Sequence, residues 1–215
     1  MRKQEKMNSK ILSTIKEHVK SNIKEYLIVA IIFLIGIVIG VVFINNINEE
    51  QKLQIQEYLG TFTESLNGDY KIDTSSLLKS SIINNLIIAL ALWFIGSTVI
   101  GIPIVYIIIG VRGFSLGYTI SSIMITYPFW KGIWFTICTL LLQNIILIPC
   151  ILALAVSGIK LYKSIIKDKR KENIKVEILR HTIFSATMAV LLILSSFIEV
   201  YGSSNLLTLC AKVFV

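Results

Sequence analysis

Residues 26–48 read YLIVAIIFLIGIVIGVVFINNIN, and they contain no charge between Glu25 and Glu49. The apolar part, Tyr26 to Ile44, has about the 20 residues that an α-helix needs to cross a bilayer core about 30 Å thick. A signal peptide would have a shorter apolar region and a cleavage site of small residues, whereas Asn45-Asn46-Ile47-Asn48 follows here. The stretch therefore predicts an uncleaved transmembrane helix.

The rest of the chain has the same character. Hydrophobic residues make up 54% of its 215 residues and charged residues 16%, against about 25% charged in an average soluble domain. The mean hydropathy is +0.75, which excludes a disordered chain and an ordinary water-soluble fold. We expect one all-α domain, a polytopic helical membrane protein with about five transmembrane helices. The predicted spans are about 26–44, 82–111, 113–130, 132–159 and 182–201.

Two uncharged blocks are longer than a single span. The block that ends at Arg112 has 32 residues, which as one straight helix would extend roughly 48 Å. The block that begins after Lys131 has 28 residues. Each contains a proline, Pro103 in the first and Pro149 in the second. Because proline removes a backbone donor and clashes with the preceding turn, we expect both helices to kink or break there.

The distribution of Lys and Arg predicts the orientation, since cytoplasmic segments of membrane proteins are enriched in both. Residues 1–25 carry seven basic and three acidic side chains, and residues 160–181 carry eight basic and three acidic ones. Residues 49–81 carry three basic and six acidic side chains. The N-terminus is therefore expected inside and the C-terminus outside. The net charge of +8 then reflects contact with anionic membrane lipid and requires no nucleic acid.

Three segments are expected outside the hydrocarbon. Residues 1–25 predict a basic amphipathic helix at the cytoplasmic surface, and residues 160–181 a basic cytoplasmic loop. The outer loop 45–81 contains a second amphipathic helix, which ends at the turn signal Asn67-Gly68-Asp69. This outer helix would lie on the outer leaflet, cap its own bundle or dock a partner. Its apolar stripe consists of Ile55, Tyr58, Leu59, Phe62 and Leu66.

Motifs for catalysis are missing from the sequence. It contains no HExxH, GxSxG or Walker motif, and no two carboxylates share one intramembrane face. His18 and His181 are its only histidines, which makes a histidine-rich metal centre unlikely to form. We therefore expect neither an enzyme nor a bound cofactor or metal.

Polar side chains inside the spans are the remaining candidates, because such groups are costly in hydrocarbon. Arg112 either anchors a span end or serves a function. Glu199 either marks the end of the last span or faces the bundle and pairs with a polar group. The amide pairs Asn84-Asn85 and Gln143-Asn144 favour interhelical hydrogen bonds over a substrate site. Proline-broken helices are also typical of transporters, so a permease-like subunit is the second hypothesis.

Several short motifs together resemble the stage II sporulation protein M family, through their order and spacing over nearly the whole chain. Two small-residue spacings, Gly36-xxx-Gly40 and Gly113-xxx-Gly117, permit close helix approach, and the second lies inside one of the shared motifs. Where relatives often have Thr-Pro after the acidic residue, this chain has Tyr201-Gly202-Ser203. The motifs that carry the resemblance are Asn84-Asn85, Gly101-Ile102-Pro103, Arg112-Gly113-Phe114-Ser115-Leu116-Gly117, Gln143-Asn144 before Pro149, and Phe197-Ile198-Glu199.

The resemblance implies an integral membrane protein of endospore-forming bacteria that acts in engulfment. A family member is expected in the septal and engulfing mother-cell membrane. There it would recruit and stabilise the peptidoglycan hydrolase called stage II sporulation protein P, in a complex with stage II sporulation protein D. The hydrolytic chemistry would belong to those partners, and this chain would be a scaffold. Whether the chain also forms a homo-oligomer is left open by the sequence.

Overall fold

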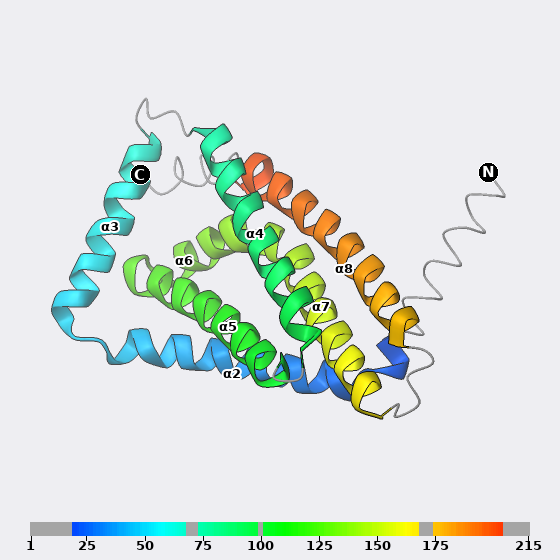
Figure 1. Ribbon diagram of the computed structural model, residues 1–215. Coiled ribbons are helices and arrows are strands. Elements are labelled where there is room, and N and C mark those ends of the chain that lie inside the picture. The colour runs from blue at the N-terminus through cyan, green and yellow to red at the C-terminus, as the bar shows by residue number, and fades with distance from the viewer. Residues whose placement is uncertain (1–18, 68–72, 99–100, 168–173, 204–215) are drawn as a thin grey trace.

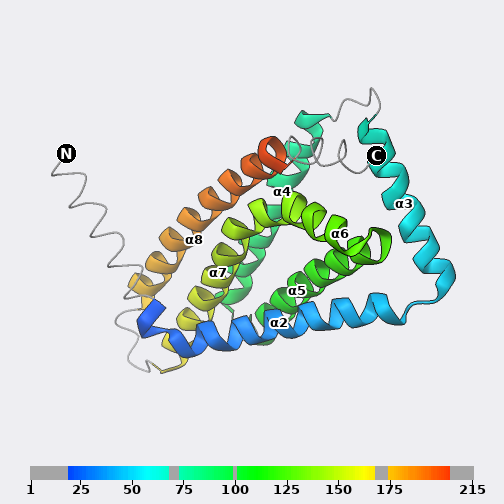
Figure 2. The ribbon, with the colours of Figure 1, turned by 180° about the vertical axis from the view of Figure 1, so that it is seen from behind.

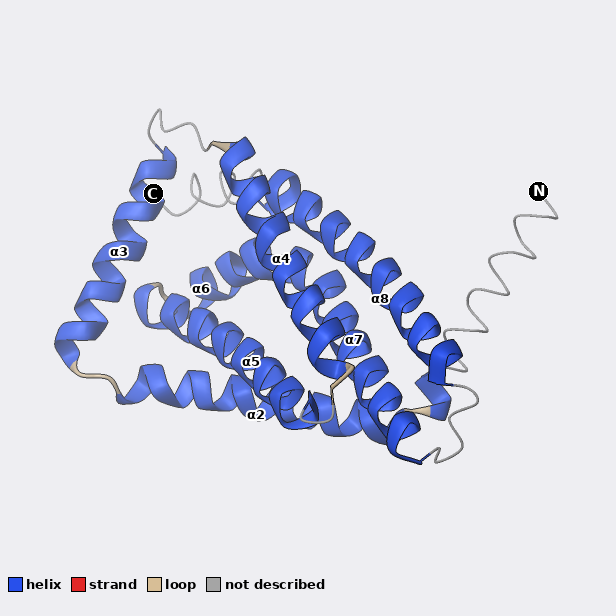
Figure 3. Cartoon of the chain, viewed as in Figure 1, coloured by secondary structure: helices blue, strands red, loops and turns tan. Residues whose placement is uncertain are grey.

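The computed structural model describes residues 19–67, 73–98, 101–167 and 174–203, which are helical throughout with short connections (Figures 1 and 3). Five helices are long and apolar enough to cross a membrane, which confirms the predicted all-α polytopic fold. The predicted amphipathic helix at the N-terminus falls largely on residues 1–18, outside the described part. The elements are α2 (Ile23–Asn46), α3 (Glu49–Asn67), α4 (Thr74–Gly96), α5 (Gly101–Thr126), α6 (Phe129–Thr136), the π-helix η1 (Ile137–Leu141), α7 (Leu142–Lys167), α8 (Ile174–Phe197) and the π-helix η2 (Ile198–Ser203).

Side-chain pairs show the relative directions of the five spans. Ser157 of α7 contacts His181 of α8, and Gln143 contacts Glu199, so these two helices are antiparallel. The bond from Asn85 to Ser196 makes α4 antiparallel to α8 as well. Helices α2, α5 and α8 thus run one way and α4 and α7 the other, as five successive crossings require.

The boundary between the second and third spans differs from the prediction. We expected the turn at Arg112, but α4 ends at Gly96 and α5 begins at Gly101. Pro103 is the third residue of α5, where its missing N–H costs no intrahelical bond. The long block is therefore interrupted just before its proline and divides into parts of two separate spans. Arg112 consequently lies near the middle of α5 and does not mark a helix end.

Of the kink or break expected at Pro149, the break does not occur. Helix α7 continues through Pro149, which lies inside it. The irregular backbone of this block lies earlier, in η1, where five residues form a π-helix between α6 and α7. A π-helix widens the turn by one residue and so shifts the direction of the side chains that follow it. The second long block is thus divided by η1 and not by its proline.

Helix α7 is the centre of the bundle. Its most apolar 18-residue window is 61% buried, whereas the other four spans have windows no more than 28% buried. Leu154, Ala155 and Val156 are fully buried there. Gly158 packs so closely on Gly96 of α4 that a Cβ on Gly96 would lie 2.7 Å from the Gly158 Cα. The other spans therefore surround α7 and present most of their apolar surface outward, as lipid-facing helices do.

The two predicted glycine pairs meet each other. A Cβ on Gly36 or Gly40 would overlap the carbonyl oxygens of Gly110 and Phe114, and one on Gly113 would overlap that of Phe33. Contacts advance along both helices together, so α2 and α5 are parallel and lie side by side (Figures 1 and 2). The absence of side chains at these positions is what lets the two backbones touch.

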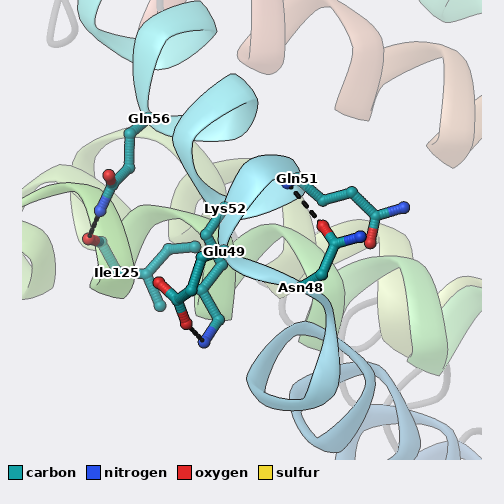
Figure 4. A network of polar contacts seen from close by, with 6 residues as sticks. All are labelled: Asn48, Glu49, Gln51, Lys52, Gln56 and Ile125. Carbon is teal, nitrogen blue, oxygen red and sulfur yellow. Dashed lines mark hydrogen bonds and ion pairs between the residues drawn. The ribbon is translucent and has the colours of Figure 1, made fainter.

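Helix α3 follows α2 after a short turn and is held against the C-terminal end of α5 (Figure 1). The Gln56 side chain donates to the Ile125 carbonyl at 2.6 Å (Figure 4). The Tyr127 hydroxyl donates to the Leu59 carbonyl at 3.1 Å and also contacts the Thr63 hydroxyl. These bonds hold α3, the predicted outer helix, against the bundle.

The orientation of the spans is open to a direct test. Reporter fusions after Gly60 should be active outside the cytoplasm, and fusions in residues 168–173 should be active inside. A fusion after Ser97 should also report inside, because the turn between α4 and α5 lies there. An external signal at Ser97 or an internal one at Gly60 would contradict the arrangement.

The contact between α2 and α5 predicts a position-dependent cost of adding a methyl group. Gly117→Ala should lower the free energy of unfolding in detergent by about 1–3 kcal/mol, the usual cost of overpacking, because its Cβ would overlap the Ile37 carbonyl. Gly60→Ala is the matched control, since a Cβ there meets nothing within 4 Å. The control should be unchanged or stabilised by about 0.5–1 kcal/mol. Equal unfolding curves for the two variants would refute the tight contact.

Candidate functional site

Glu199 is the centre of a polar cluster between three spans. Its Oε2 accepts a hydrogen bond from Nε2 of Gln143 on α7 at 2.6 Å, and another from the hydroxyl of Ser81 on α4. Glu199 lies in η2, which continues α8, and so it connects all three helices. Of the two alternatives left by the sequence, the structure selects the one in which this carboxyl group faces the bundle.

Two further hydrogen bonds extend this cluster. Asn85, which is 3% exposed, donates from Nδ2 to the Ser196 hydroxyl at 2.8 Å. The Ser195 hydroxyl donates to the backbone carbonyl of Gln143 at 3.2 Å. Both serines are fully buried, and with Glu199 they fall on one face of the helix. Asn85 and Gln143 therefore act as the interhelical bonds that their position in the spans predicts.

The neighbouring amides behave differently. Asn84 is exposed on α4, although it adjoins the buried Asn85. Asn144 donates to the carbonyl of Leu140, four residues earlier in its own chain, at 2.7 Å. The sequence pairs Asn84-Asn85 and Gln143-Asn144 thus each contribute one residue to the cluster, because adjacent residues of a helix point about 100° apart.

Arg112 approaches the cluster from α5. It is close enough to Glu199 for an electrostatic interaction between the two charges. It lines a small cavity of about 150 Å³, together with Ser115, Thr119, Gln143 and Asn144. Phe33 of α2 and apolar residues of α7 close the remaining sides. The structure therefore places Arg112, Gln143, Asn144 and Glu199 in one region, as the sequence did not predict.

A larger apolar groove lies between α3 and the bundle. Its volume is about 710 Å³, and Tyr58 and Phe62 of the predicted stripe form its α3 side. Tyr58 is 73% exposed and Phe62 is 38% exposed, while Ile123 and Phe135 form a buried floor. The side chain of Leu66 lies outside the described part. We call this space the outer groove.

A second polar group joins α4, α7 and α8 at their other ends. Nδ1 of His181 lies 2.8 Å from the Ser157 hydroxyl, and its Nε2 lies 3.4 Å from the Trp93 carbonyl. A neutral imidazole that accepts from Ser157 and donates to Trp93 satisfies both contacts. Ser157 and His181 are 7% and 3% exposed, so this serine and histidine act as interhelical contacts within the bundle. From the sequence, His181 was considered only as a metal ligand, and these partners were not identified.

The cluster and the groove include Asn85, Gln143, Glu199 and Phe62 of the residues singled out in the sequence, and Arg112 and Asn144 line the small cavity. Gly113 and Gly117 form the contact with α2, and Pro103 begins α5. Within the described residues, no group of three His, Cys, Asp or Glu side chains could hold a metal ion. Ser81, Ser195 and Ser196 were missed, although the spacing of Ser195, Ser196 and Glu199 on one helical face was a readable signal.

The adjacent asparagines of α4 allow a matched test of the polar cluster. Asn85→Ala should lower the free energy of unfolding by about 0.6 kcal/mol, and by up to about 1.7 kcal/mol, because it removes an interhelical bond in the membrane. Asn84→Ala removes the same chemical group from an exposed position and should leave the unfolding curve unchanged. Denaturant titrations in detergent measure both, and an equal loss in the two variants would refute the assignment.

Comparison with known proteins places the chain in a family. Residues 29–204 match the family described as stage II sporulation protein M, and this range includes both π-helices, the polar cluster and the outer groove. No curated protein and no solved structure matches the chain. The family is not known as a family of enzymes. The chain therefore belongs to the stage II sporulation protein M family and is a sporulation-related, multi-pass membrane protein.

Proposed function

We propose that this chain is a non-enzymatic scaffold for endospore engulfment, in the septal and engulfing mother-cell membrane. It recruits and stabilises a peptidoglycan hydrolase, stage II sporulation protein P, which works there together with stage II sporulation protein D. Family membership supports the sporulation role. The finer assignment rests on a surface that could hold a partner on the side of the membrane where peptidoglycan lies.

The outer groove is the observation that carries this proposal. It is apolar, and the positive-inside distribution of Lys and Arg predicts that it lies at the outer surface. Exposed Tyr58 and Phe62 form its rim on α3, and two large side chains of this kind each contribute about 1.5–3 kcal/mol when fully buried by a partner. An apolar helix of the hydrolase that packs on this rim would be held next to its substrate.

The polar groups support a scaffold over an enzyme. Glu199 accepts from Gln143 and Ser81, and His181 contacts Ser157 and a backbone carbonyl. These side chains satisfy one another inside the bundle, and a catalytic set needs groups directed at a substrate. The chemistry is accordingly assigned to the partners.

A permease-like subunit is the second candidate, and the cavity beside Arg112 favours it. A charged group next to amides within a span is a common feature of substrate paths. Solute uptake into proteoliposomes that contain this chain alone separates the two functions. Uptake that depends on Arg112 would favour transport, whereas loss of hydrolase localisation on deletion, without any flux, favours the scaffold.

Substitutions on the α3 rim test the scaffold function. Phe62→Asp combined with Leu66→Asp should release the hydrolase, because charged side chains prevent burial of the apolar stripe. Co-purification of the hydrolase from sporulating cells should fall to background, while the amount of this protein in the membrane stays the same.

Leu53→Asp is the matched control. Leu53 also lies on α3 and is 62% exposed, but it does not line the outer groove. It should retain the hydrolase at the wild-type yield. If the Phe62/Leu66 variant co-purifies with as much hydrolase as the Leu53 variant does, the docking surface is not on this rim.

A further inference from the structure

The guanidinium of Arg112 is the basic group placed deepest in the described spans, and it has no complete set of partners there. It is the twelfth residue of the 26-residue α5. A cation at this depth costs several kcal/mol unless it is paired or hydrated. Within the described part of the chain, no carboxylate oxygen lies within the 4.0 Å of an ion pair, and the guanidinium makes no hydrogen bond.

Glu199 is the acid whose charge acts on Arg112, but one of its two carboxylate oxygens is engaged with other residues. Its Oε2 already accepts from Gln143 and Ser81, which hold the carboxyl group toward α4 and α7. Its charge therefore acts on Arg112 through space without occupying the guanidinium donors. Arg112 keeps five N–H donors in a planar fork, which is the geometry that binds a carboxylate or a phosphate at two points.

The cavity beside Arg112 adjoins the outer groove, because Thr119 and Leu140 line both spaces. The polar cavity lies at Phe33 of α2, and the apolar groove lies farther along the chain, at Phe43 of α2 and at Ile47 just after its end. A cationic, amide-lined space of about 150 Å³ thus lies next to an apolar one of about 710 Å³. This is the order of polarity in an amphiphile.

We propose that this space binds one anionic phospholipid, with its phosphate on Arg112 and an acyl chain along the floor of the outer groove. The phosphate supplies the charge that α5 lacks, and the buried side chains Ile123 and Phe135 contact the chain. The polar end is nearer the predicted cytoplasmic ends of α2 and α5, so the phosphate of the lipid lies toward the cytoplasm and its acyl chain toward the outer surface. The proposal does not depend on the scaffold function, which uses the exposed rim of the groove.

Lipid binding to the purified full-length chain tests this directly. Native mass spectrometry would follow titrations with phosphatidylglycerol, with diacylglycerol of the same acyl chains, and with inorganic phosphate. Phosphatidylglycerol should bind at least about tenfold more tightly than diacylglycerol, as expected when a charged hydrogen bond is gained. Inorganic phosphate alone should neither bind nor compete at equal concentration, because it lacks the acyl chain.

Substitutions then locate the site. Arg112→Gln should remove the preference for phosphatidylglycerol, and Arg112→Lys should retain part of it, since lysine keeps the charge but not the planar fork. Arg180→Gln is the matched control, because this substitution removes the same charge from an exposed position. Thr119→Phe leaves every charge in place but fills the junction between cavity and groove, so it should also weaken phosphatidylglycerol binding about tenfold.

The outcomes separate clearly. Loss of the preference in Arg112→Gln and Thr119→Phe, with Arg180→Gln unchanged, supports the lipid site. If Arg112→Gln does not fold, Arg112→Lys and Thr119→Phe still provide the test. Equal binding of phosphatidylglycerol and diacylglycerol, or wild-type preference in Thr119→Phe, overturns the proposal. Competition by inorganic phosphate at equal concentration would show a free-anion site and overturn the assignment to a lipid.

Discussion

A polar group in hydrocarbon must find its partner within the protein, and this requirement organises the described bundle. Glu199 satisfies it by accepting hydrogen bonds from α4 and α7 while it belongs to the continuation of α8. His181 and Ser157 link the same three helices at their other ends. Polar contacts at both ends therefore set the register of α4, α7 and α8, and apolar packing fills the space between them.

A different principle holds the other pair of spans. Helices α2 and α5 lie in contact through glycines and not through polar side chains. Their close approach places α5 beside α7, and it brings Arg112 toward the cluster around Glu199. Helix α3 is then fixed by Gln56 and Tyr127 against the end of α5. The outer groove lies between α3, which these bonds hold in place, and the buried side chains of the bundle that form its floor.

The sequence was sufficient for the fold class and the number of spans, and it identified the glycines that permit close helix approach but not the two helices that meet there. Charge-free length is a direct consequence of bilayer thickness, and the glycine spacing follows from helix geometry. An interruption near Pro103 was expected, and α4 and α5 separate just before that residue. The span boundary was nevertheless placed at Arg112, because this residue was taken as a helix end, whereas a long side chain can lie inside a span when it lines a polar cavity. The π-helices could not be predicted, since a one-residue widening of a turn depends on packing around η1 and η2 and has no clear local signature.

The candidate site was predicted only in part, because its contacts also depend on how the helices pack. Asn85, Gln143 and Glu199 were recognisable as costly groups that need partners, but the sequence did not say which groups would meet. Asn84 and Asn85 have the same side chain in adjacent positions, and only the direction of α4 against α8 decides which of them is buried. The outer groove depends on the orientation of α3 relative to the bundle. That orientation follows from tertiary hydrogen bonds such as the one between Gln56 and Ile125.

The glycine contact between α2 and α5 also has a consequence for biosynthesis. Residues 47–100, which include α3 and α4, separate these two helices in the chain. During synthesis α2 enters the membrane before α5 has been translated. The glycine surface of α2 that later packs against α5 therefore faces lipid until α5 is inserted. Helices α7 and α8 can pair as soon as the second one is made. The contact between α2 and α5 thus forms only after α5 has been made, and a quality-control protease of the membrane that acts before then would meet α2 in its unpaired state.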